Sequence, residues 1–278
     1  MRIAHALIGL ALCPLIALGA IDTGSWSLAP AEQGKVQLSL QRSSPGHHFD
    51  TSSAWQLADL RGLDWAAAPA KHDVHFTIAR DAGTIDCNGV VQDERGAGLF
   101  TFKPNLQYLQ EMQKLGYSFN EDELFSATVF DVSFEFVRAL KGLSVQGLDA
   151  RKLMAFRIHG VSPEFVRELR AAGVQATDAD KLIAFRIHGV SPEFVKDLRG
   201  AGVNVTDEDK LIAFRIHGVS PEFAGELSHL GYPHAPPEQL IALRIHGVTP
   251  EYIESIRSKG LQNITLDQLI SMRIHGID

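Results

Sequence analysis

A chain of 278 residues is long enough for one large domain or two smaller ones. Its 45% hydrophobic and 21% charged residues exclude an intrinsically disordered chain. The formal net charge of −7 excludes a general electrostatic attraction to nucleic acid or to anionic lipid.

The first twenty residues have the pattern of a secretory signal. Arg2 gives a basic start, residues 3–18 are almost wholly apolar, and the segment ends in Gly19 and Ala20. We therefore predict a cleavable signal peptide over residues 1–20, a periplasmic or secreted protein, and no transmembrane segment in the mature chain. A retained N-terminal anchor is the alternative interpretation. A lipid anchor at Cys13 is rejected because Leu12 is too large for the residue before a lipobox cysteine.

Cleavage after Ala20 leaves Cys87 as the sole cysteine, so no intrachain disulfide is expected. A reactive thiol would need a nearby base. We expect Cys87 to be a small buried residue in a strand.

Residues 21–104 predict a small antiparallel β domain. Alternating polar and apolar residues predict strands at 35–41 and 74–78, and further strands are expected at 84–91 and 99–102. Residues 43–53 are expected to form a polar loop, and residues 55–63 one or two helical turns. Short Gly-bearing turns at 81–83 and 93–98 would join the last three strands into a meander, with strand 35–41 added at an edge.

Four histidines of this domain, His47, His48, His72 and His75, could in principle gather around a metal ion. Their spacing fits no known ligand pattern, and paired histidines in a polar loop are usually solvated. Asp81 and Asp86 near Gly83 are explained by turn chemistry. We therefore expect no metal, no cofactor and no catalytic residue.

The second part of the chain is organised by a repeat. The four residues Arg-Ile-His-Gly begin at Arg157, Arg186, Arg215, Arg244 and Arg273, always 29 residues apart. A fixed period of this length is typical of repeat architectures.

Each repeat predicts a pair of helices. In one copy Ser191 caps a helix that begins at Pro192 and stops at Gly202, and a second helix covers 207–217 before Gly218. The second helix is apolar on more than one side, Ile216 included, so we expect it to be covered on several faces. The pattern extends back to residue 105 as about six pairs, the first degenerate. The last pair lacks an obvious polar cap and is expected to offer a docking face.

The repeated junction residues are the candidate site. Histidine and glycine are expected to end each second helix rather than to bind metal, because neighbouring helices hold equivalent histidines too far apart for one ion. These residues are His159, Gly160, His188, Gly189, His217, Gly218, His246, Gly247, His275 and Gly276.

The junction arginines have two interpretations. They could form ion pairs with the glutamate seven residues later, or form a ladder that binds carboxylates or phosphates. We favour the ion pairs for Arg157 with Glu164, Arg186 with Glu193, Arg215 with Glu222 and Arg244 with Glu251; Arg273 belongs to the same arginine ladder.

Residues 182–192 resemble the helix-hairpin-helix motif of DNA-binding proteins, in which a Gly-hydrophobic-Gly turn presents backbone N–H groups to phosphate. Gly189 and Val190 match, but Ser191, and Thr249 in the last full junction, replace the second glycine. From Ala150 onward, 15 Lys and Arg stand against 16 Asp and Glu, without the basic excess that phosphate contacts require. DNA binding therefore stays an alternative, and nucleic acid is not the expected partner.

The chain from residue 21 onward also resembles a family of exported bacterial proteins of undefined activity. The resemblance rests on Arg-Asp-Ala-Gly-Thr at residues 80–84, Phe-Thr-Phe-x-Pro-Asn at residues 100–105, and the Arg-Ile-His-Gly-Val-Ser/Thr-Pro-Glu repeats. Similar segments are appended to membrane metallopeptidases of the β-lactam-sensor type, whose zinc motif and membrane helices this chain lacks. The resemblance implies a sensing or interaction module that faces the cell envelope.

Together these observations predict an α+β protein with a small N-terminal antiparallel β domain (21–104) and an α-helical hairpin repeat array (105–278). We expect a non-enzymatic module that binds a protein partner in the cell envelope through its helical repeat surface. A DNA-binding envelope protein is the first alternative, and a hydrolase that uses the β domain is the second.

Overall fold

The computed structural model describes residues 22–44 and 47–277. The predicted signal peptide and Cys13 lie outside the described residues. In the part of the chain that the structure describes, six strands precede twelve α-helices, which confirms the α+β class. No helix among the described residues has both the length and the apolar character needed to cross a membrane.

The described chain divides into two compact units. The sheet unit holds the described residues up to Thr77 together with Ile85–Lys103, and the helical unit holds Ile78–Thr84 and the chain from Pro104 onward. The predicted division at residue 104 therefore differs from these units mainly in residues 78–84, which are the tip of a strand hairpin.

The six strands form one sheet with the order β3-β2-β1-β6-β5-β4. Their bounds are β1 Asp22–Pro30, β2 Lys35–Ser44, β3 His47–Gln56, β4 His72–Arg80, β5 Gly83–Gln92 and β6 Arg95–Pro104. The meander of the last three strands is as predicted. The earlier strand was expected at an edge of this meander, but β1 lies against β6 and β2 lies between β1 and β3.

Two strands of the sheet have weak sequence patterns. Strand β1 was not predicted, and β3 occupies the expected polar loop. Edge strand β3 pairs with β2 through exposed polar side chains, such as Ser52 with Gln37 and Ser39, so it shows little apolar alternation. The expected helical turns at 55–63 are a single 3-10 turn at Leu57–Asp59.

The turn between β5 and β6 also differs from the prediction. It consists of Asp93 and Glu94, both with positive φ (51° and 56°), and β6 begins directly afterwards at Arg95. Two positive φ values are those of the tight hairpin turn whose twist matches a β-sheet, usually made with Gly or Asn.

The twelve helices form six pairs, in agreement with the repeat count. Their bounds are α1 Leu106–Lys114, α2 Glu121–Val129, α3 Phe134–Gly142, α4 Ala150–His159, α5 Pro163–Ala171, α6 Ala179–His188, α7 Pro192–Gly200, α8 Glu208–His217, α9 Pro221–His229, α10 Pro237–Ile245, α11 Pro250–Ser258 and α12 Leu266–Ile274.

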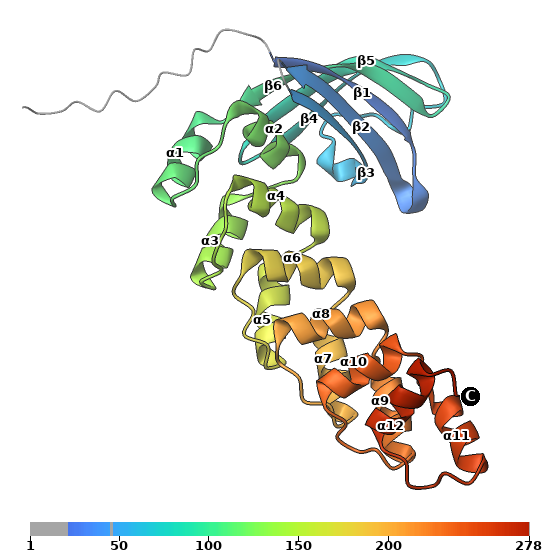
Figure 1. Ribbon diagram of the computed structural model, residues 1–278. Coiled ribbons are helices and arrows are strands. Elements are labelled where there is room, and N and C mark those ends of the chain that lie inside the picture. Colours follow the sequence, from blue (N-terminus) through green and yellow to red (C-terminus); the bar gives the residue numbers. More distant parts are fainter. Residues whose placement is uncertain (1–21, 45–46, 278) are drawn as a thin grey trace, which may run out of the picture. The chain divides into compact units, whose positions relative to one another are not determined.

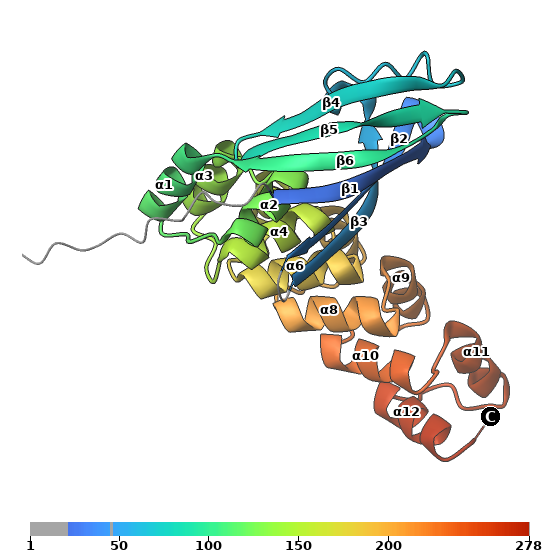
Figure 2. The same cartoon turned by 90° about the horizontal axis from the view of Figure 1, so that it is seen from above.

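The pairs stack so that each helix packs on the helix two places later in the chain. The second helices α2 to α12 form one row and the first helices α3 to α11 form another (Figure 1). Figure 2 shows the row of second helices from α4 to α12. The core between the rows is built from the same repeat positions in each pair. Phe156, Phe185 and Phe214, for example, are all fully buried.

Candidate functional site

The junction between consecutive pairs has a fixed backbone geometry. At the end of α6, Gly189 has a left-handed φ of 74°, and the N–H of Val190 donates to the carbonyl oxygen of Phe185 at 2.8 Å. Ser191 then accepts a hydrogen bond from the amide of Phe194, with Pro192 in the first turn of α7. This combination ends one helix and starts the next within three residues. The remaining junction glycines, Gly160, Gly218, Gly247 and Gly276, have φ between 68° and 72°.

The five junction histidines are exposed on the helical unit. His159, His188 and His217 are the last residues of α4, α6 and α8, whereas His246 and His275 follow α10 and α12. The Nδ1 atom of His275 lies 2.7 Å from the carbonyl oxygen of Ser271 in the last turn of α12. Within residues 22–44 and 47–277, no three or more side chains capable of holding a metal ion come together.

The junction arginines contact different partners from those predicted. Arg186 of α6 places its guanidinium 4.8 Å from the ring centre of Phe165 in α5, and its Nε donates to the carbonyl oxygen of His159 at the end of α4. One side chain of α6 thus contacts both preceding helices, α5 and α4. Arg215 makes the equivalent contacts, to Phe194 and to the carbonyl of His188.

The other arginines follow this arrangement with small differences. Arg244 stacks on Phe223, and Arg273 stacks on Tyr252 and donates to the carbonyl of Gly247. We call these contacts the arginine clamps. They are favourable because a cation lies both on an aromatic face and at the negative end of a helix dipole.

The predicted pairs of Arg157, Arg186, Arg215 and Arg244 with the following glutamates are therefore corrected. Within residues 22–44 and 47–277, these arginines form no ion pair with those glutamates; Glu164, for example, binds Arg167 instead, at 2.7 Å. These glutamates, Glu164, Glu193, Glu222 and Glu251, stand in the first turns of α5, α7, α9 and α11. Hydrogen bonds lower the pKa values of these four glutamates. The largest cause is the hydrogen bond from the backbone amide at Glu164, Glu193 and Glu222, and the hydrogen bond from the Thr249 hydroxyl at Glu251.

Several junction glycines leave room for the arginine clamps, in addition to ending the helix. A Cβ atom placed on Gly160 would lie 2.7 Å from Nη2 of Arg186, and one on Gly189 would lie 2.8 Å from Nη2 of Arg215. The arginine of one pair thus fits against the bare glycine of the preceding pair.

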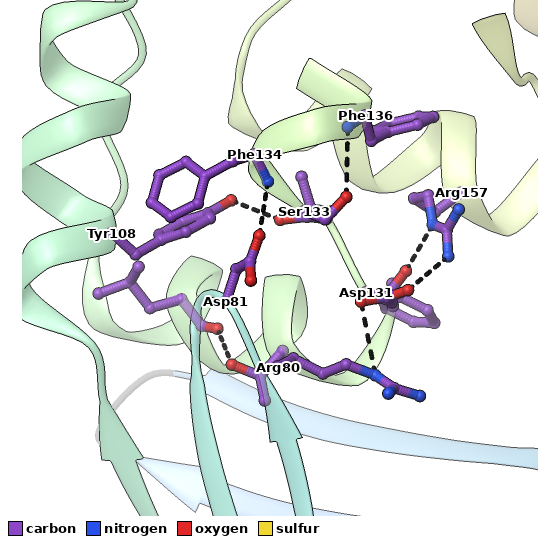
Figure 3. Close-up of polar contacts among 12 residues, drawn as sticks. Arg80, Asp81, Tyr108, Asp131, Ser133, Phe134, Phe136 and Arg157 are labelled. Carbon is purple, nitrogen blue, oxygen red and sulfur yellow. Dashed lines mark hydrogen bonds and ion pairs between the residues drawn. The ribbon is translucent and has the colours of Figure 1, made fainter. Parts of the chain in front are cut away.

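The first junction is a variant in which an acidic residue takes the glycine position (Figure 3). Asp131 has a φ of 54°, and Arg157 donates from Nε to the carbonyl of Phe130 and from Nη2 to the Asp131 carboxylate at 3.1 Å. Arg80, from the hairpin tip, places its Nε 3.4 Å from the other carboxylate oxygen. Two cations therefore share one carboxylate at the start of the array.

The hairpin tip also supplies hydrogen bonds to the first helices (Figure 3). The Asp81 carboxylate accepts from the amide of Phe134 at 2.8 Å, and the backbone oxygen of Asp81 accepts from the side chain of Asn105. The buried Tyr108 hydroxyl donates to the carbonyl of Val132, and burial, then Asp81 and Asp131, raise its pKa. Asp81 and Tyr108 thus hold the chain at the start of α3.

Two further sets of contacts join successive pairs, and the sequence did not indicate either. Arg199 of α7 donates from its Nη2 to the carbonyl of Ala172 at the end of α5. Lys141, Arg170 and Arg257 make the same kind of bond to Leu115, Leu143 and Leu230. The second set links neighbouring second helices through Lys152 with Asp180, Lys181 with Asp209, Lys210 with Glu238 and Gln239 with Asp267.

The isoleucines of the Arg-Ile-His-Gly repeats are exposed, although Ile216 was expected to be covered. Their exposed fractions are nearly equal, at 55% for Ile158, 57% for Ile187, 56% for Ile216, 54% for Ile245 and 57% for Ile274. Single exposed apolar residues are normal, but the same residue exposed in five stacked pairs forms a continuous row. We call this row, with the half-buried apolar residues one turn before it, the isoleucine face.

The remaining sequence candidates do not assemble into a site. His48 contacts Ser43, His72 contacts the backbone of Asp64 and Ala70, and His75 pairs with Asp86. The side chain of His47 lies outside the described residues. Cys87 is fully buried in β5 as expected, and burial raises the pKa of its thiol. An open cavity of about 590 Å³ lies beside α12 and is lined by residues such as Leu261 and Met272.

Comparison with protein-family models gives no match for this chain, and comparison with curated proteins gives none either.

Proposed function

We propose that this chain is an exported, non-enzymatic interaction module whose isoleucine face binds a protein partner in the cell envelope. The observation that carries the proposal is the exposure of the same isoleucine, between 54% and 57%, in five consecutive pairs. Burying such a row against a partner would remove a large apolar surface from water, which is the main driving force of protein association.

The other repeated residues support this assignment because they already have structural partners. Glycine and serine form the junction, arginine forms the clamp, and lysine binds the next second helix. The isoleucine instead leaves more than half of its surface exposed in each of the five pairs. A large apolar side chain exposed at the same repeat position favours a surface that repeats with it.

Export and the envelope are part of the proposal on sequence grounds. Residues 1–20 have the pattern of a secretory signal, and the resemblance to envelope-facing repeat proteins points to the same compartment.

The DNA-binding alternative gains no support from the junction geometry. An ionised glutamate stands in the first turn of α5, α7, α9 and α11, where a phosphate would have to approach the backbone amides. The junction arginines are bound to aromatic rings and helix ends. No specific observation favours the hydrolase alternative.

The test replaces the centre of the isoleucine face and asks whether a partner is lost. The triple variant Ile187→Ser, Ile216→Ser and Ile245→Ser should keep the helical circular dichroism of the wild type but recover at least tenfold less of a specific protein from envelope extract. The control triple variant Val90→Ser, Leu99→Ser and Leu106→Ser removes exposed apolar residues elsewhere and should leave recovery unchanged. Equal recovery by both triple variants would refute the proposal.

A further inference from the structure

The isoleucine face has a definite composition on each second helix. On α6, Asp180, Ile183, Ala184 and Ile187 lie at i, i+3, i+4 and i+7, so they share one side of the helix. Asp180 and Ile187 are exposed, while Ile183 and Ala184 are half-buried. The stripe therefore runs from an exposed carboxylate at the start of the helix to an exposed isoleucine at its end.

The stripe recurs on the next three second helices, with an exposed serine, Ser271, in place of the alanine on α12. It begins at Asp209 on α8, Glu238 on α10 and Asp267 on α12, and it ends at Ile216, Ile245 and Ile274. On α4 the first position is Arg151 instead. Four adjacent helices thus present an apolar surface with an acidic border along one edge.

The acidic border keeps its negative charge toward solvent even though each carboxylate has a partner. Asp180 is 68% exposed while its partner Lys152 is 28% exposed, and Asp209 is 77% exposed while Lys181 is 36% exposed. In each of these pairs the carboxylate is about twice as exposed as the lysine that binds it. A ligand that approaches this edge meets carboxylate oxygens first.

The spacing of the stripes favours a helix as the ligand. Packed helices lie about 8–10 Å apart, so the stripes recur at that distance along the row. A helix laid across the row rises about 10.5 Å in seven residues, which brings the same heptad position to each stripe. In a β-strand, residues three apart also span about 10 Å, but they point to opposite faces.

We propose that the isoleucine face binds a cationic amphipathic helix of a partner protein. Its apolar side packs on Ile187, Ile216 and Ile245, and its Lys or Arg side chains reach Asp180, Asp209 and Glu238. This proposal rests on the proposed function and adds the chemistry of the partner. A helix in an aliphatic surface is a known mode of peptide recognition.

The experiment uses the full chain and a defined probe, a fluorescently labelled peptide of four heptads with leucine on one side and lysine on the other. Saturable binding in fluorescence anisotropy is expected, and it should weaken as salt rises because the border contributes electrostatically. A peptide with glutamate in place of lysine should not bind. Absence of saturable binding, or equal binding of the two peptides, would overturn the proposal.

Two variants locate the binding. Asp180→Asn with Asp209→Asn and Glu238→Gln should weaken the affinity at least tenfold, as should the triple isoleucine variant. A control with the same change in charge, Glu168→Gln with Asp197→Asn and Glu226→Gln, alters exposed carboxylates of first helices and should bind normally. Equal losses in the border variant and this control would overturn the assignment to this face.

The two proposals fail in different ways. If the lysine peptide does not bind while the triple isoleucine variant still loses an envelope protein, the cationic helix is wrong and the interaction module stands. If the peptide binds at the face but envelope capture is unaffected by the isoleucine changes, the interaction module is wrong as stated.

Discussion

At the scale of single residues, the clearest requirement is for glycine at the junctions. Gly189 combines a φ of 74° with the close approach of Arg215, so a side chain there would strain the backbone and displace the end of the arginine. Gly200, only eleven residues later, has neither constraint: it lies in α7, and a Cβ atom on it would meet nothing within 4 Å.

Substitution by alanine at these two glycines should change the free energy of unfolding in opposite directions. Gly189→Ala should lower the free energy of unfolding by about 2 kcal/mol, from the left-handed backbone and displacement of the arginine. Gly200→Ala should raise it by about 0.5 kcal/mol, because alanine reduces the entropy of the unfolded chain. Urea denaturation followed by circular dichroism measures both. A loss of stability in Gly200→Ala similar to that in Gly189→Ala would contradict this explanation.

The residue scale also shows which parts of the site could be predicted from sequence. The caps could, because a glycine stop, a hydroxyl cap and a first-turn proline act within a few neighbouring residues. The partners of the arginines could not. Arg186 binds the carbonyl of His159, 27 residues earlier, and a backbone carbonyl has no sequence signature. Glu193, seven residues after Arg186, was the predicted partner, but Arg186 contacts the His159 carbonyl and the Phe165 ring.

At the scale of elements, hydrogen bonds from a Lys or Arg side chain to a backbone carbonyl recur between stacked first helices, and one helix lacks this residue. Lys141, Arg170, Arg199 and Arg257 each donate to the end of the preceding first helix. The corresponding residue of α9 is Ser228, which is too short to reach Ala201 at the end of α7. The ring of His234 instead lies near Gly202.

Restoring the missing basic residue should strengthen this position. Ser228→Arg should stabilise the array by about 1 kcal/mol through a charge-assisted bond to the Ala201 carbonyl. Hydrogen exchange should show slower exchange in α7 and α9. The control Ser255→Arg adds the same charge on an exposed position of α11 and should leave exchange in α7 and α9 unchanged. Identical exchange in the wild type and Ser228→Arg would show that an arginine cannot take this position.

The elements of the sheet were harder to predict than the helices. Caps and a 29-residue period indicate the helix pairs in the sequence, whereas β1 and β3 have few apolar residues at alternate positions. Strand β3 is an edge strand, so its exposed side chains are polar and its sequence resembles a loop. The exposure of the isoleucine face was also missed, because an apolar residue in a repeat is normally read as core.

At the scale of the whole molecule, the hairpin tip formed by Ile78–Thr84 belongs to the helical unit. Asp81 caps the amide of Phe134, and its neighbour Arg80 shares the Asp131 carboxylate with Arg157. The stability of α3 should therefore depend on Arg80 and Asp81, which precede it by about fifty residues in the sequence.

Asp81→Ala tests this dependence. It should lower the free energy of unfolding measured by helical circular dichroism by about 1–2 kcal/mol, since an amide at a helix start loses its acceptor. The control Asp64→Ala removes another loop carboxylate, one that accepts a hydrogen bond from the amide of Ala67 at 3.3 Å in the sheet unit. A larger effect on the helical signal from Asp64→Ala than from Asp81→Ala would show that the hairpin tip does not support the array.

The arginine clamps reach backward by nearly one full repeat each time. Because every clamp joins equivalent positions of adjacent pairs, an in-frame deletion or duplication of one 29-residue unit recreates the same set of bonds at the new boundary. The array can therefore change length by recombination between its own copies without losing any type of contact. Each such event would lengthen or shorten the isoleucine face by one stripe, and with it the length of helix that the face can hold.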